Sequence, residues 1–189
     1  IRRAKLNVFA VRTGELIDDL PELIAIVGPL LKARGAIEQQ IDDLDRKVLK
    51  LARYDAQVRG FMTVPGVGPI TALCFKATID DPTRFKRSRS VGAYVGLTTR
   101  RHASGEVDWS GRISKCGDAM LRSYLFEAAG VLLTRVPKWS ALKAWGMKLA
   151  KRNGLRKAKV AVARKLAVIL HRMWIDGTEF NWSKKQTVA

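Results

Sequence analysis

A serine beside a glycine lies inside an arginine-rich loop, and this arrangement is the one in the sequence best suited to covalent chemistry. Ser104 precedes Gly105 and follows Arg100 and Arg101. Guanidinium forks bind phosphate bidentately, and a glycine lets a phosphate backbone approach closely. The hydroxyl of a serine in such an anion pocket could attack a phosphodiester if another group polarises it. Most Ser-Gly pairs are ordinary turns, however, so spacing alone favours a turn.

A second glycine-flanked basic turn follows at residues 111–118 and precedes a predicted helix. Its Arg112 and Lys115 are candidates for phosphate contacts. His102 could assist proton transfer, although a phosphate contact is the preferred interpretation. Cys116 is expected to fill space rather than to act as a reactive thiol.

Residues 63–72 contain two prolines and two closely spaced glycines, and no helix continues through such a stretch. Apolar residues lead into it and out of it. The pattern therefore predicts a helix, a tight hairpin and a second helix, with Pro69 in the first position of the second helix. Backbone N–H groups in such a helix-hairpin-helix could hold phosphate, so Gly66, Val67 and Gly68 are candidate contacts to a nucleic-acid backbone. The alternative is an ordinary turn between two helices.

A basic run without any acidic residue lies near the C-terminus. Its members are Lys151, Arg152, Arg156, Lys157, Lys159, Arg164 and Lys165. This exceeds what a solvated helix face needs, and it predicts contact with a DNA or RNA backbone. Trp139, Trp145 and Trp174 are at helical spacing and are expected in the core, with base stacking as the alternative role.

The overall charge points the same way. The chain has 189 residues, a formal net charge of +18 and a pI near 10.5, which indicate a polyanionic partner. No apolar run approaches the ~20 residues that a membrane span needs, and no signal peptide is recognisable. Two cysteines and two histidines cannot build a disulfide framework or a four-ligand zinc site. We therefore expect no metal or cofactor in this chain and a cytoplasmic location.

The N-terminal part carries a heptad pattern, with a seam in alternating steps of four and three. The seam consists of Leu23, Val27, Leu30, Arg34, Ile37, Ile41, Leu44, Val48 and Leu51. It predicts a coiled coil that dimerises or separates two domains; the alternative is an amphipathic helix packed on its own domain. Pro29 and Gly35 weaken the early half, and Gly14 is expected to interrupt any helix before residue 20.

The remaining sequence predicts short helices. The second helix of the hairpin should end near Ile79, where Asp80 and Asp81 cap a turn. Further helices are predicted at 85–94, 118–133, from Pro137 to residue 153, and 155–174, with His171 on a helix surface. Residues 97–117 read as a loop with room for a small hairpin.

The fold class is therefore all-α. We divide the chain into a basic lead-in (1–20), a coiled-coil or linker helix (21–60), a helical domain with the hairpin and the Ser-Gly loop (61–182) and a flexible tail (183–189).

Three blocks make the sequence recognisable. VPGVGPITAL, FKRSRSVGAYVGLTTR and SGEVDWSGRISKCGDAMLR occur in this order. Together they resemble the C-terminal domain of insertion-sequence transposases that combine a RuvC-like DEDD domain with a serine-bearing domain, the bridge-RNA-guided recombinases. The resemblance implies that Ser104 is the nucleophile of a covalent phosphoserine link to DNA. It also implies phosphate contacts from Arg112 and Lys115, and a coiled coil between the two domains.

The resemblance further implies that the catalytic groups are divided between two domains. The family's DEDD carboxylates lie in an N-terminal domain that has no counterpart in this sequence. Asp80, Asp81, Glu106, Asp108 and Asp118 do not replace them. Mg²⁺ is therefore expected only with a RuvC-like domain, and we expect a fragment, a truncated frame or a decayed element that is inactive alone.

The implied partners are DNA, a structured guide RNA and a second copy of the chain, in a bacterial, nucleoid-associated setting. The alternatives are a non-catalytic nucleic-acid-binding module and an interaction protein that acts mainly through its coiled coil.

Overall fold

The computed structural model describes residues 6–182 and contains two compact units, unit 1 (residues 1–49) and unit 2 (residues 50–189). The boundary falls within one long helix, α2 (Pro21–Tyr54). The predicted tail at 183–189 and the first five residues of the lead-in lie outside the described residues. Within the described part, no helix is long and apolar enough to cross a membrane.

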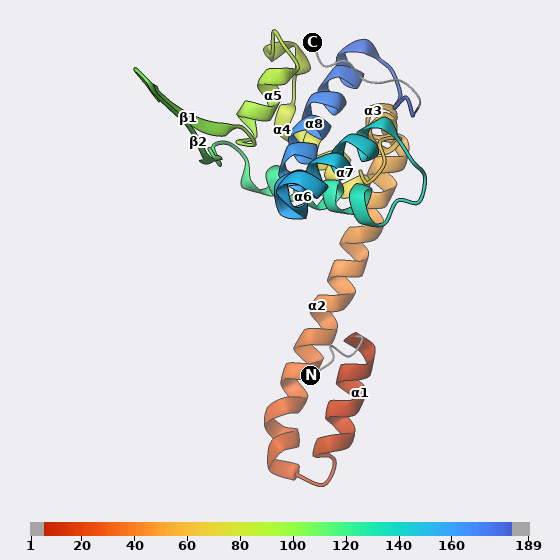
Figure 1. Cartoon of the computed structure of the whole chain (residues 1–189). Helices are drawn as coiled ribbons and strands as arrows, with labels where there is room; N and C mark the ends of the chain where they lie inside the picture. Colours follow the sequence, from red (N-terminus) through yellow and green to blue (C-terminus); the bar gives the residue numbers. More distant parts are fainter. Residues whose placement is uncertain (1–5, 183–189) are drawn as a thin grey trace. The chain divides into compact units, whose positions relative to one another are not determined.

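Unit 1 is a pair of antiparallel helices. Helix α1 (Leu6–Ile17) is followed by a short turn and by the first part of α2 (Figure 1). The expected interruptions are wrong: α1 passes through Gly14, and α2 passes through both Pro29 and Gly35. A glycine costs a helix only about 1 kcal/mol, and in proteins packing contributes more to helix stability than propensity does.

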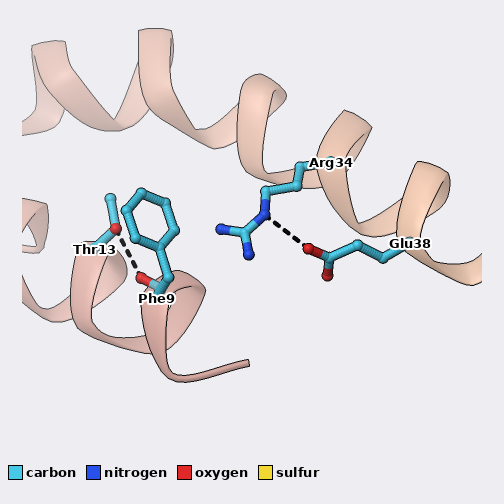
Figure 2. Close-up of polar contacts among 4 residues, drawn as sticks. All are labelled: Phe9, Thr13, Arg34 and Glu38. Carbon is cyan, nitrogen blue, oxygen red and sulfur yellow. Dashed lines mark hydrogen bonds and ion pairs between the residues drawn. The ribbon is translucent and has the colours of Figure 1, made fainter. Parts of the chain in front are cut away.

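The packing of the two helices explains the charged residue in the heptad seam. The Arg34 guanidinium carbon lies 4.6 Å from the centroid of the Phe9 ring, and Nε donates to Glu38 Oε1 at 2.8 Å. Thr13 Oγ1 donates to the Phe9 carbonyl at 2.7 Å within α1, and Figure 2 shows these four residues where α1 and α2 face each other. Arg34 therefore faces α1, where it covers an aromatic ring with its cation.

The apolar seam residues of α2 are not covered in the same way. Leu30, Ile37, Ile41 and Leu44 are 65%, 60%, 51% and 58% exposed. The alternative of an amphipathic helix packed on its own domain is therefore wrong for these four residues. The coiled coil stays a prediction.

Unit 2 is helical around one central helix, so the all-α class is confirmed. Its elements are α3 (Ala56–Met62), α4 (Pro69–Ile79), η1 (Pro82–Arg84), α5 (Arg89–Tyr94), β1 (Thr99–Ser104), β2 (Val107–Ile113), α6 (Ala119–Thr134), α7 (Ala141–Asn153) and α8 (Leu155–Asp176). Helix α8 packs against α3, α5, α6 and α7 (Figure 1). Phe61, Phe75 and Trp174 form an aromatic cluster in the core, with Phe61 edge-on to both other rings at 5.3 and 5.4 Å.

Several helix ends follow the sequence signals. Asp118 caps α6 by accepting from the Leu121 N–H at 2.6 Å, and Asp81 caps η1 through the Thr83 N–H. Gly177 closes α8 in the left-handed conformation. The expectation that Pro137 opens a helix is wrong, because Ser140 supplies the cap and α7 begins at Ala141.

His171 is buried rather than on a helix surface, so that prediction is wrong. Its Nε2 lies 2.8 Å from the Pro82 carbonyl oxygen and its Nδ1 lies 3.0 Å from Ser88 Oγ. Since a carbonyl only accepts, Nε2 carries the proton and Nδ1 accepts from the Ser88 hydroxyl. Two hydrogen bonds thus allow a polar ring to join α8 to the segment before α5.

Candidate nucleic-acid interface

A β-hairpin carries the candidate serine at its far end. Strands β1 and β2 pair antiparallel, with Ser104 opposite Val107 and the two-residue turn Gly105–Glu106 between them. The hairpin extends beyond the helices of unit 2 (Figure 1), and Ser104 and Gly105 are exposed. The loop predicted for 97–117 therefore contains the small hairpin, and it presents the serine to solvent.

The root of the hairpin is tightly held. Arg122 of α6 donates through Nη1 to the carbonyls of Val95 and Cys116, both at 3.2 Å, and so joins the two ends of the hairpin segment. Gly117 has a φ of +77°, and a Cβ at this position would lie 1.9 Å from the Tyr94 carbonyl oxygen. Only glycine fits this contact. The root is fixed to α5 and α6, and Ile113 at the end of β2 packs against the core.

The candidate phosphate ligands of the hairpin differ in their availability. The Arg101 fork is bound by Asp108, with Nε 2.8 Å from Oδ1. This pairing raises the pKa of Arg101 and lowers the pKa of Asp108. Arg100 donates through Nη2 to the Ser114 carbonyl at 3.2 Å and keeps other donors. A phosphate at Arg101 would therefore have to displace Asp108.

Arg112 and Lys115 are exposed near the root. The strand pairing is irregular between Thr99 and Arg101, where β2 carries one extra residue, so Arg100 lies opposite Gly111 and Arg112. Arg100 and Arg112 thus come from facing positions of the two strands. The hairpin brings these two cations together and places Ser104 at the other end.

The turn between α3 and α4 packs against α6. Gly66 has a φ of +89°, and a Cβ there would lie 2.4 Å from the Ala128 carbonyl oxygen. Val67 is buried, and its N–H is bonded to the Val64 carbonyl at 3.0 Å. Among the described residues, none accepts from the N–H of Gly66, or from those of Gly68 and Ile70 at the start of α4. Of the predicted contacts, Gly66 and Gly68 therefore each keep an N–H donor, whereas Val67 does not.

The basic run lies where α7 ends and α8 begins. Lys151 and Arg152 occupy the last turn of α7, where cations are favourable, but Arg156 and Lys157 lie in the first turn of α8, which has no acidic residue. All four side chains are exposed. Cations at a helix N-terminus repel its positive end, so an anion bound there would relieve this repulsion.

Two lysines of α8 are partly used for packing. Lys159 is half-buried, with Nζ 5.4 Å from the Phe126 ring centroid. Lys165 Nζ lies 4.6 Å above the Trp145 ring, and burial lowers the pKa of Lys165. These two residues can therefore offer less to a phosphate than the four exposed cations.

The cysteines and carboxylates have ordinary roles. Cys74 is half-buried against the core, as expected, and burial raises the pKa of its thiol. Cys116 is exposed. Over residues 6–182, no three metal-ligating side chains of the described set come close enough to hold an ion.

Two residues of the interface were missed or misplaced by sequence reasoning. Arg122 gives no local signal, since its carbonyl partners lie up to 27 positions away. Trp139 was expected in the core but is 61% exposed, whereas Trp145 and Trp174 pack against the core as expected. The position of Trp139 directly before the cap Ser140 is a signal for a residue outside the helix.

Comparison with known proteins finds similarity to one family. Residues 58–145 match the family model described as Transposase IS116/IS110/IS902 family. This match covers α4, the hairpin, α6 and the start of α7, and with them the candidate serine.

Three relatives illustrate the similarity. A protein of Sinorhizobium fredii named as a transposase is 36% identical over 149 residues, which are 78% of this chain and 38% of the relative. The transposase for insertion sequence element IS1111A of Coxiella burnetii is 35% identical over 134 residues, 70% of this chain and 37% of the relative. The pilin gene-inverting protein of Moraxella bovis is 28% identical over 135 residues, 68% of this chain and 41% of the relative.

The matched part thus spans less than half the length of each of these three relatives. The family match lies within unit 2. Residues 58–145 are thus similar to the transposases of the IS116/IS110/IS902 family.

Proposed function

We propose that the chain is the DNA-binding and catalytic-serine part of a transposase or site-specific recombinase that acts on insertion-sequence DNA. The observation that carries the proposal is Ser104, exposed at the end of a rooted hairpin within a transposase domain. The relatives named as transposases, and one named for the inversion of a gene, support a reaction that moves DNA segments.

The proposed reaction is strand transfer through a phosphoserine. Ser104 Oγ attacks a backbone phosphorus, a P–Oγ bond forms, and the P–O bond to the departing strand breaks. The departing oxygen takes up a proton, and the serine loses one. A hydroxyl of the strand to be joined then attacks the same phosphorus and releases Ser104.

The cations of the hairpin would hold DNA phosphates near its root, at the opposite end of the hairpin from the phosphate that Ser104 attacks. Arg100, Arg112 and Lys115 neutralise these charges, and Arg101 can join them only by giving up Asp108. On α7 and α8, Lys151, Arg152, Arg156, Lys157 and Lys159 hold backbone phosphates further along the DNA. The turn of Gly66, Val67 and Gly68 would act as the helix-hairpin-helix contact, mainly through the N–H groups of Gly66 and Gly68.

Among the side chains that the structure describes, none hydrogen-bonds to the Ser104 hydroxyl and could activate it. A serine hydroxyl is a weak nucleophile at neutral pH and needs a base or a metal-organised site. Since the described carboxylates of this chain do not gather, we derive no step from a metal held by it. We propose that a RuvC-like domain with Mg²⁺ completes the site, with a structured guide RNA and a second copy of the chain as further partners.

The test is covalent capture of DNA by the 189-residue chain. Alone, with or without Mg²⁺, the chain should leave labelled insertion-sequence DNA uncut. With a RuvC-like partner domain it should yield a protein–DNA adduct that survives denaturation. Ser104→Ala should abolish the adduct and leave DNA affinity nearly unchanged, because one hydroxyl adds little to a phosphate-dominated interface.

Ser123→Ala is the matched control, since Ser123 is an exposed serine on α6 whose hydroxyl bonds only within its helix. This variant should keep the adduct. An adduct that persists in Ser104→Ala contradicts the assignment and moves it to Ser110 or Ser114.

A second candidate function is a non-catalytic nucleic-acid-binding module for DNA or guide RNA. The repulsive cluster at the start of α8, with Arg156 and Lys157 at the positive end of the helix, favours binding whether or not the serine reacts. Unchanged binding together with no adduct under any partner condition would select this function.

A further inference from the structure

A patch of two tryptophans and two lysines lies on unit 2, away from the hairpin residues in sequence. It consists of Lys138, Trp139, Lys143 and Trp182, and we refer to it as the tryptophan–lysine patch. Trp139 lies in the loop between α6 and α7, directly before the cap Ser140, and is 61% exposed. The exposed indole gives this surface a flat aromatic face that a ligand could cover.

The Trp139 ring is supported from one side. Lys143 is only 9% exposed, and its Nζ lies 5.3 Å from the Trp139 ring centroid. The same ammonium donates to the Val136 carbonyl, which fixes its position. Because the ammonium is buried and the ring is exposed, the indole covers Lys143 with one face and leaves the opposite face to solvent. The ring is thus held in place before any ligand arrives.

The second half of the patch is anchored to the core. Lys138 Nζ lies 4.3 Å from the centroid of the Trp182 ring, and Trp182 packs edge-on against Phe180 at 5.4 Å. Phe180 is buried, and its N–H donates to Thr63 Oγ1 at 3.0 Å. The segment that follows α8 is therefore fixed beside the turn after α3, and it adds a second indole with a cation against it.

The charge around the patch selects the class of ligand. No acidic residue occurs between Glu127 and Asp176. On α7, Lys148, Lys151 and Arg152 are exposed. Lys151 lies about 15 Å along α7 from its first residue, Ala141, at 1.5 Å per residue. An open ring face followed by a row of cations matches a ligand with flat bases and repeating phosphates.

We propose that the tryptophan–lysine patch binds a single-stranded nucleic acid, with one unpaired base stacked on the open face of Trp139. Phosphates on either side of that base would meet Lys138 and the cations of α7. Bases inside a duplex are stacked on one another and cannot reach the ring, so the patch discriminates against paired strands. The inference rests on the proposed function only in that the chain binds nucleic acid, and it does not involve Ser104.

The experiment compares three ligands of about twelve nucleotides, within the range that one small binding surface covers: oligo-dT, oligo-U and a DNA duplex. For the 189-residue chain, Trp139→Ala should weaken binding of the single strands by about 5- to 150-fold, the range measured for one stacked base. Duplex affinity should change by less than about 2-fold, since phosphates dominate it. The oligo-dT and oligo-U arms distinguish DNA from RNA as the source of the strand.

Two variants keep the result interpretable. Trp139→Phe retains a ring and should keep most of the single-strand affinity. Tyr54→Ala removes another exposed aromatic side chain, 79% exposed on α2, and should have no effect.

If Trp139→Ala loses equal affinity for single strands and for duplex, the proposal is overturned. If Trp139→Ala binds single strands as tightly as the wild type does, the proposal is also overturned, and a protein would be left as the ligand of the ring. A wild-type chain that binds duplex but no single strand overturns the patch and leaves the proposed function standing. A wild-type chain that binds neither single strands nor duplex overturns both the patch and the proposed function.

Discussion

Asp55 illustrates how much a single carboxylate holds together in unit 2. Its Oδ1 caps α3 by accepting from the Val58 N–H at 3.1 Å, and its Oδ2 pairs with Lys76 Nζ of α4. Burial raises the pKa of Asp55, but the bonds from Lys76 and Val58 outweigh this effect, and the pKa is lowered overall. The two helices on either side of the α3–α4 turn are thus joined by one side chain.

Asp55→Asn should remove the ion pair and keep the cap, because asparagine caps helices as well as aspartate does. Both partners are about one-third exposed, so the loss should be about 0.5–1 kcal/mol at pH 7. A lowered pKa stabilises the fold above the unfolded value of 3.8, and this contribution is lost as pH falls through the folded value. Urea unfolding should therefore show the full difference at pH 7 and a smaller difference once the pH falls below 3.8.

Lys76→Met serves as the control, since it breaks the same pair from the other side. The free energy of unfolding of the double variant should fall by no more than about the amount that either single variant loses. A wild-type advantage over Asp55→Asn that is as large at pH 3 as at pH 7 would contradict an ionic origin.

At the level of elements, the sequence predicts well where helices end and poorly which elements pack against them. Asp118 and Gly177 mark the ends of α6 and α8 because caps act within a few residues. His171 and Arg34 have the polarity of surface residues, yet each faces another element, because periodicity shows which residues share a face and not what covers it. The same limit applies to the site: the hairpin could be anticipated, but its clamp by Arg122 could not.

The root of the hairpin gives a sharp prediction for one glycine. Gly117→Ala combines a left-handed backbone with a Cβ placed 1.9 Å from the Tyr94 carbonyl oxygen, so backbone must move. Gly177→Ala is the matched control, because Gly177 has a φ of +61° and open space around its Cβ. We expect a loss of about 1 kcal/mol for the control and about 3 kcal/mol or more for Gly117→Ala.

Thermal unfolding of both variants measures this difference directly. Gly117→Ala should also lower the yield of the Ser104 adduct, because the hairpin would no longer be held at its root. Equal melting temperatures of the two variants would show that the contact with Tyr94 does not constrain the root.

At the scale of the whole molecule, the exposed seam of α2 in unit 1 predicts that two copies of the chain associate. Leu30, Ile37, Ile41 and Leu44 leave a continuous apolar stripe in water at heptad spacing, and a second copy of the same helix can cover it. A closed dimer is the commonest outcome of such a self-complementary surface. Two copies would also bring two serine hairpins to the DNA, which a reaction joining two strands can use.

Sedimentation should therefore find the wild-type chain as a dimer at tens of micromolar, roughly as for a weak coiled coil. The double variant Ile37→Glu with Leu44→Glu places like charges on the stripe in both copies and should be monomeric at the same concentration. Lys32→Gln with Gln39→Glu changes the net charge by the same amount on the face of the helix away from the seam, and should stay dimeric. A monomeric wild type rejects the dimer, and equal dissociation of both double variants would assign the association to net charge rather than to the seam.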